Sequence, residues 1–155
     1  MTYSVDTTSI RVDALPDVVV ALSALQGPEF RDRVLALEES MREYPQIDAP
    51  LVHRFAPGLY ARECALPAGS MVVGKIHRHA HLIQLLKGKA TIATEHGTRT
   101  YEAPEMWTSI PGAKRVVYSH TDTVFVTFHP SDETDLEKLE EHIIAPTYAA
   151  LEHVL

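Results

Sequence analysis

The chain has 155 residues, of which 45% are hydrophobic and 23% charged, as expected for one globular domain with a hydrophobic core. Its net charge of −7 argues against a broad nucleic-acid interface, which needs a basic face. The sequence contains no apolar run long enough for a bilayer span, no signal-peptide pattern near its start, and one cysteine, Cys64, which excludes an internal disulfide. We therefore expect a cytoplasmic protein that binds neither nucleic acid nor membrane.

Residues 1–50 are predicted to form an N-terminal arm that is largely helical. Residues 1–12 are either a polar leader or a short first strand. Pro16 precedes an apolar run that extends to residue 25, which predicts a helix with proline near its first turn. Residues 28–44 are the clearest helix, because apolar side chains recur at helical spacing between charged ones. We expect this amphipathic helix to cover a sheet or a partner.

Residues 51–130 have a different pattern, in which short apolar runs alternate with turn residues. The pattern predicts about nine strands, at evenly spaced intervals that are typical of an antiparallel sandwich or barrel. The runs cover residues 51–55, 59–66, 71–77, 81–86, 90–94, 98–101, 106–110, 114–119 and 124–129. Residues 131–155 are predicted to form C-terminal helices that pack on this barrel.

Three histidines stand two residues apart at His77, His79 and His81. In an extended backbone, side chains alternate between the two faces, so all three would lie on one face. Neutral imidazoles that converge on one point can ligate a divalent metal. The mostly apolar run at residues 82–86 follows them, which places this group at the mouth of a cavity.

The spacing around these histidines resembles the first motif of the cupin superfamily. That motif reads Gly, five residues, His-x-His, three or four residues, Glu, six residues, Gly. The matching positions in this chain are Gly69, Lys75, His77, His81 and Gly88. The second cupin motif, Pro-x-Gly-x-x-His, is similar to residues 110–115, where Gly112 matches and Arg115 stands in the histidine position.

This resemblance covers about residues 51–130. It implies a mainly β protein with a single cupin-type antiparallel β-barrel or jelly roll, flanked by N- and C-terminal helices. Residues 57–63, 74–77 and 129–130 also resemble a group of small uncharacterised cupin-like proteins encoded by tailed bacteriophages. That group has no activity that could be carried over to this chain.

The cupin resemblance leaves two interpretations of the site open. The usual cupin metal set has three histidines and one glutamate, whereas this chain has Lys75, His77, His81 and Arg115 in those positions. Lysine and arginine are cations near neutral pH and repel a divalent metal, unless His79 completes a set with His77 and His81. Alternatively, Lys75 and Arg115 in one pocket would bind a phosphate or carboxylate.

Later strands offer further candidates for the cavity. His129 shares a face with Thr127 by strand alternation, whereas His120 falls on the opposite face from Arg115. Metal-free cupins that act on nucleotide-linked sugars use a histidine and basic residues, and this chain resembles them in broad outline.

Three functions follow from this resemblance. The first is a protein that binds a small anionic molecule in the barrel cavity, and the incomplete metal set favours it. The second is a metal-dependent enzyme of the isomerase, epimerase or dioxygenase kind, and the third is a phage interaction or scaffold protein without a ligand. Exposed sheet edges and the amphipathic helix also predict a homodimer.

Overall fold

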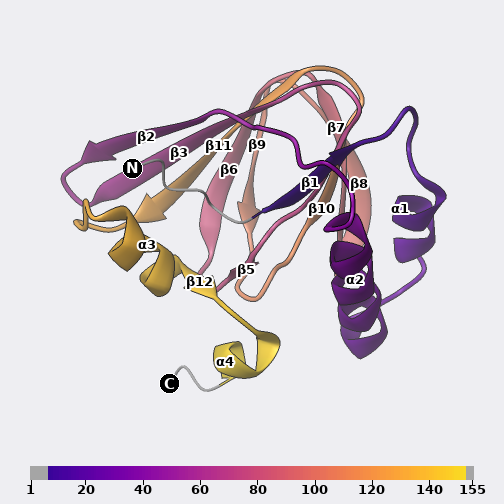
Figure 1. The fold of residues 1–155 in the computed structure, drawn as a ribbon. Helices are drawn as coiled ribbons and strands as arrows, with labels where there is room; N and C mark the ends of the chain where they lie inside the picture. Colours follow the sequence, from indigo (N-terminus) through magenta and orange to yellow (C-terminus); the bar gives the residue numbers. More distant parts are fainter. Residues whose placement is uncertain (1–6, 153–155) are drawn as a thin grey trace.

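The computed structural model describes residues 7–152, which form two antiparallel sheets of five strands each (Figure 1). In sheet A the order is β1 (Thr8–Arg11), β4 (Ser70–Val73), β10 (Val116–Ser119), β7 (Lys89–Thr94) and β8 (Gly97–Glu102). In sheet B it is β2 (Leu51–Ala56), β3 (Leu59–Leu66), β11 (Thr123–Pro130), β6 (His81–Lys87) and β9 (Glu105–Ser109).

This architecture confirms the predicted cupin-type jelly roll. Helices precede the strands of the jelly roll in the sequence and follow them. Within the described residues the two sheets remain separate, so the fold is a sandwich rather than a closed barrel. The predicted strands are present, and residues 8–11 form the short first strand. The predicted strand at residues 71–77 is divided, because β4 pairs with β10 only as far as Val73 while β5 (Ile76–His77) pairs with β12 (Ile144–Ala145).

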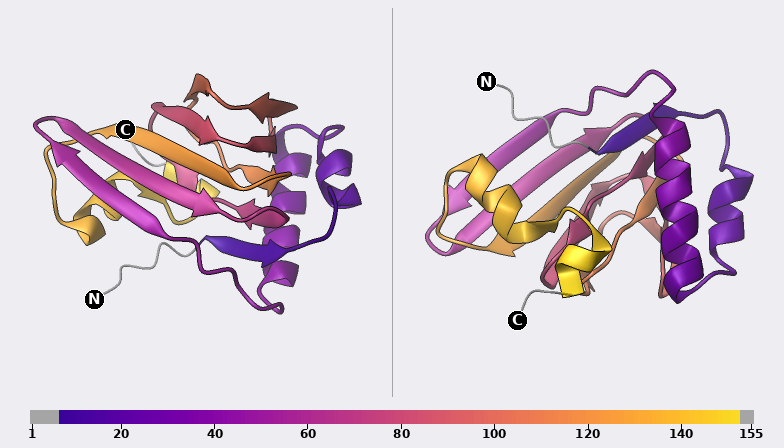
Figure 2. Two further views of the ribbon diagram at one scale, coloured as in Figure 1. Left: turned by 90° about the horizontal axis from the view of Figure 1, so that it is seen from above. Right: turned by 60° about the horizontal axis from the view of Figure 1, so that its bottom comes forward.

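Helices α1 (Asp17–Leu22) and α2 (Gly27–Met41) pack on the outer face of sheet A, at the opposite end of the molecule from α3 (Figures 1 and 2). Phe30 and Val34 of α2 are buried in one cluster with Val73 and Val116 of the sheet. Most of the apolar stripe of this helix is therefore used within the chain, and Leu35 is the part of it that stays exposed, at 43%. The homodimer stays a prediction.

The space between the two sheets is filled by the alternate side chains of the same strands. In β4, Met71 and Val73 belong to the helix-covered cluster, whereas Val72 packs between the sheets with Ile83 and Phe125. This period of two follows from the pleat of a strand, and it gives sheet A two apolar faces.

Two motif glycines are required by the backbone. Gly69 has φ 79° and Gly88 has φ 88°, a region that favours glycine. A Cβ at Gly69 would lie 2.8 Å from the carbonyl oxygen of Val12, and a Cβ at Gly88 would collide with the carbonyl oxygen of Asp122. The cupin-like glycine spacing therefore has a steric cause in this fold.

The C-terminal segment closes one end of the sandwich. It contains α3 (Leu136–Ile143), β12 and α4 (Tyr148–Glu152), and none of the helices within residues 7–152 is long and apolar enough to cross a lipid bilayer. Leu139 and Ile143 of α3 pack on Tyr60 at the end of sheet B. Because Ile144 of β12 pairs with His77, the same segment also fixes the backbone of β5.

Candidate functional site

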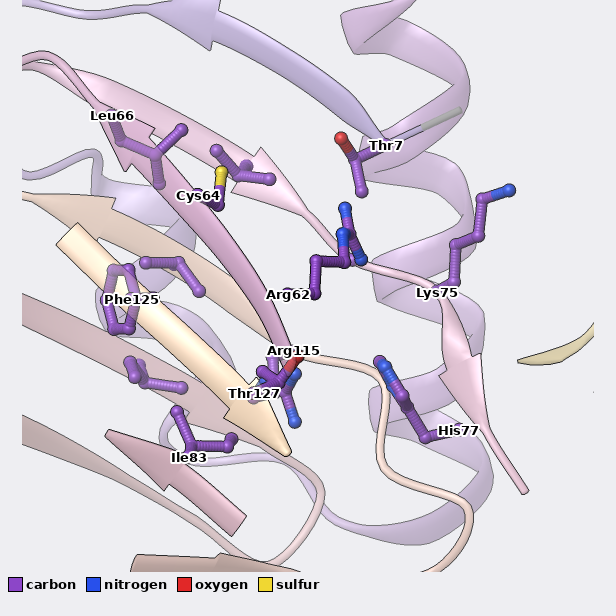
Figure 3. Close-up of a pocket in the computed structure, with 14 residues that line it drawn as sticks. Thr7, Arg62, Cys64, Leu66, Lys75, His77, Ile83, Arg115, Phe125 and Thr127 are labelled. Carbon is purple, nitrogen blue, oxygen red and sulfur yellow. The ribbon is translucent and has the colours of Figure 1, made fainter. Parts of the chain in front are cut away.

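A cavity of about 100 Å³ lies between the sheets (Figure 3). One end is lined by the apolar side chains of Leu66, Val72, Ile83, Ile92, Val117 and Phe125, with Cys64 beside them. The other end is lined by Thr7, Arg62, Lys75, His77, Arg115 and Thr127. The cavity therefore combines a hydrocarbon-like end with a cationic and polar end.

Strand pairing in sheet B produces this gradient. In β3, alternate residues point into the cavity, and their partners across the ladder in β11 do the same. Leu66 and the pair Cys64 and Phe125 lie at the apolar end, whereas the pair Arg62 and Thr127 begins the polar end. The next pair, Tyr60 and His129, lines a smaller neighbouring pocket beneath α3, which shares Arg62 and His77 with the cavity.

Three histidines gather at the polar end, and each comes from a different strand. His77 lies in β5, His81 in β6 and His129 in β11, with exposed fractions of only 6%, 4% and 5%. The ring centroids of His77 and His81 are 4.5 Å apart, those of His81 and His129 4.7 Å, and those of His77 and His129 6.0 Å. The fold thus brings together His77 and His81, which the motif identified, with His129.

Two ring nitrogens of this cluster have no hydrogen-bond partner among the described residues. These are Nδ1 of His77 and Nε2 of His81, and both are buried. By contrast, Nε2 of His129 lies 3.0 Å from Oγ1 of Thr127. Buried polar atoms normally have partners, so two such nitrogens in one histidine cluster mark it as a place where a ligand or water can bind.

Arg62 and Arg115 enter the cavity from opposite sheets. Nη1 of Arg115 donates a 2.9 Å hydrogen bond to Oγ of Ser109, while Nε of Arg62 is buried and has no partner within residues 7–152. Neither guanidinium forms an ion pair with an acidic side chain in the described part of the chain. Burial, followed by the charge of Arg62, lowers the pKa of Arg115 to about 10, so it remains protonated at neutral pH.

The same environment keeps the histidines neutral. Burial, followed by the charge of Arg115, lowers the pKa of His77 well below its ordinary value and that of His81 to about 4. Burial and then the neighbouring His81 lower the pKa of His129 to about 3, with smaller contributions from the two arginines. At pH 7 the two guanidinium cations therefore lie close to three neutral imidazoles, of which His77 lines the cavity itself.

Lys75 and His79 differ from the other residues that the sequence predicted for the site. Lys75 lines the cavity, but its Nζ donates to the carboxylate of Glu140 in α3. His79 is exposed, and its ring stacks at a tilt on His142 with 5.2 Å between centroids. The chain bends after the two residues of β5, so strand alternation stops and His79 does not share the face of His77 and His81.

These residues do not fit the metal that the cupin resemblance implies. Two positions of the usual set carry Lys75 and Arg115, which are cations. Within residues 7–152, no group of three or more histidine, cysteine, aspartate and glutamate side chains is arranged to hold a metal ion. The arginines that help to lower the histidine pKa values would also repel a dication in the same place.

The motif analysis missed Arg62 altogether. It precedes the first motif, and its only signal is the alternation in β3, where an arginine stands between Tyr60 and Cys64 among inward positions. His129 was a candidate from its own alternation, and the structure places it in the cluster. His120 lies elsewhere, with Nε2 2.6 Å from Oγ1 of Thr91.

No family model and no curated protein matches the chain. Among solved structures, it is similar to a salicylate 1,2-dioxygenase from Pseudaminobacter salicylatoxidans, with 14% identity, a TM-score of 0.52, and coverage of 74% of this chain and 36% of that one. A cupin 2 conserved barrel domain protein from Salinispora arenicola matches with 15% identity, a TM-score of 0.45, and coverage of 58% and 84%.

An acetylacetone dioxygenase from Acinetobacter johnsonii matches with 23% identity, a TM-score of 0.43, and coverage of 53% of this chain and 58% of that one. The chain thus spans less than two thirds of the length of either dioxygenase. At these identities the likeness shows the cupin fold alone.

Proposed function

We propose that this protein binds a small anionic molecule in the cavity between its sheets. The observation that supports the proposal is the pair of arginines, Arg62 and Arg115, which share one cavity and have no acidic partner within residues 7–152. Two like charges in a poorly solvated space repel each other and lose hydration, so a counter-anion between them would be strongly favoured.

The residues around the arginines suit such a ligand. A guanidinium presents several N–H donors in a planar fork that matches a carboxylate or phosphate. Nδ1 of His77 has no partner among the described residues and can carry the N–H of this neutral imidazole, whereas Nδ1–H of His81 donates to the backbone carbonyl of His79, 3.3 Å away, and leaves Nε2 as an acceptor. An anion held by Arg62 and Arg115 would therefore find one further donor, His77, close by.

A metal-dependent enzyme is the less favoured function for this site. The histidine cluster is its only support, and the two guanidinium charges oppose a dication. A scaffold without a ligand is less favoured because it leaves the buried charges unexplained.

Calorimetric titration of the purified protein with sodium acetate and sodium phosphate, at constant pH and ionic strength, tests the proposal. We expect saturable binding of at least one anion, and Arg115→Met should weaken it by about tenfold to a hundredfold, since a hydrogen bond to a charged group is lost. Arg54→Met is the matched control, because Arg54 pairs with Glu63 and does not line the cavity. Absence of any anion binding by the folded wild type would contradict the proposal.

A further inference from the structure

Resting on the proposed anion site, we propose that the ligand is a monocarboxylate with a short hydrocarbon body rather than an inorganic anion. The cationic end of the cavity accounts for the charge of the ligand. The apolar end belongs to the same cavity and has no role in holding a charge.

The apolar end is built by both sheets. Val72 and Ile92 come from sheet A, and Leu66, Ile83 and Phe125 come from sheet B, and all five are buried. Water gains few hydrogen bonds from such walls, and cavities lined in this way stay dry and take up hydrocarbon. A phosphate or sulfate at the arginines would leave this space unfilled, whereas an alkyl group would occupy it.

The strand register sets the distance between the two ends. The cross-strand pair Cys64 and Phe125 lies two residues along the strands from the cross-strand pair Arg62 and Thr127. Two residues of a strand extend about 7 Å, which is comparable to the length of a carboxylic acid with a few carbons. A carboxylate at Arg62 would therefore direct its alkyl chain toward Phe125.

The volume limits the ligand to a small one. The cavity measures about 100 Å³. Since an apolar cavity of about 150 Å³ accepts benzene, a ligand of roughly four to six non-hydrogen atoms fits, which corresponds to acetate, propionate or butyrate. A long-chain fatty acid exceeds this space.

The test is a calorimetric series on wild-type protein with formate, acetate, propionate, butyrate, octanoate and inorganic phosphate, all at pH 7.5 and one ionic strength. We expect the affinity to rise by about fourfold for each added CH₂ from acetate to butyrate, because each group leaves water for the apolar end. Octanoate and phosphate should bind more weakly than butyrate.

Val117→Thr sharpens the test. Val117 lines the cavity, and threonine has nearly the same shape but places a hydroxyl at the apolar end. We expect butyrate to lose about fivefold or more in affinity while formate changes less than twofold. Val52→Thr makes the same substitution on an exposed valine outside the cavity and should change neither.

The outcomes separate this inference from the proposed function. A flat series, or phosphate that binds more tightly than butyrate, would overturn the hydrocarbon assignment and leave the anion site standing. Absence of binding by every anion would overturn both. If Val117→Thr does not fold, the wild-type series decides alone, because it needs no variant.

Discussion

The two ends of the space between the sheets are made by the same strands and have opposite energetics. At the apolar end, Leu85 and Phe125 pack between the sheets, and each stabilises the fold by leaving water. At the polar end, Arg62, Arg115 and His77 are also removed from water, and for them this removal is unfavourable unless a partner is present. One end therefore supports folding, whereas the other end opposes it, and the proposed anion would offset that cost.

The largest expected effect comes from the apolar end. Leu85→Ala removes a side chain that is 0% exposed, and it should lower the free energy of unfolding by about 2–5 kcal/mol through lost burial and the cavity that remains. Leu86→Ala, one residue along the same strand but 46% exposed, should change it by less than about 0.5 kcal/mol. Urea denaturation measures both. Equal effects for the two leucines would contradict the assignment of the apolar end.

Acid should destabilise the protein through the polar end. In the unfolded chain each histidine takes up a proton near pH 6.5, whereas in the fold the pKa of His81 is about 4 and that of His129 about 3. Between these values the unfolded state binds more protons, so stability rises with pH and is lost as pH falls from about 6.5 toward 4.

The urea midpoint at pH 7, 6, 5 and 4 measures this loss. We expect the free energy of unfolding to fall by up to about 1.4 kcal/mol per pH unit for each of the three histidines, because each one binds a proton in the unfolded chain only. His129→Gln is the comparison variant, because it removes one of the buried titrating groups, and it should flatten the dependence. His96→Gln changes an exposed histidine and should not. A midpoint that stays constant across this range would rule out three buried neutral histidines.

Removing a cation from the polar end should stabilise the ligand-free protein, although the same change should weaken the binding of an anion. Arg115→Met replaces a guanidinium that has no acidic partner within residues 7–152 by an apolar chain of similar length. We expect a gain of about 1 kcal/mol in the free energy of unfolding without anion, since a desolvated charge is lost. Thermal denaturation in anion-free buffer measures it. A clear loss of stability would indicate that Arg115 is structural.

The sequence predicted the fold much better than the chemistry of its interior. Strand alternation and the two glycines, Gly69 and Gly88, are local signals, because φ and the pleat follow from the residue and its neighbours. The prediction for His79 was wrong because it assumed one continuous strand from His77 to His81, whereas the chain bends at residues 78–80, between β5 and β6.

Arg62 shows the corresponding limit for the site. It lies in β3, next to a strand that begins more than sixty residues later, so nothing near it in the sequence indicates Thr127 as its neighbour. The sequence could predict that His129 faces the cavity side because its alternation with Thr127 is local. Its contact with His81, however, depends on how β11 pairs with β6. The motif supplied the positions His77, His81 and Arg115, and long-range strand pairing supplied the rest.

The smallest expected effect on stability comes from the edge of the polar end, where Lys75 and Glu140 form an ion pair. Their side chains are 20% and 28% exposed, and pairs near solvent contribute at most about 1 kcal/mol. Glu140→Gln should therefore hardly change the urea midpoint. It removes a negative charge next to a cavity-lining lysine, so the affinity for a small carboxylate should rise by about twofold to fivefold.

Glu141→Gln removes an exposed charge from the same helix away from the cavity, and it should leave that affinity unchanged. Because the two variants carry the same net charge, a rise in both would reflect the overall charge of the protein, and a rise in neither would place the anion away from Lys75.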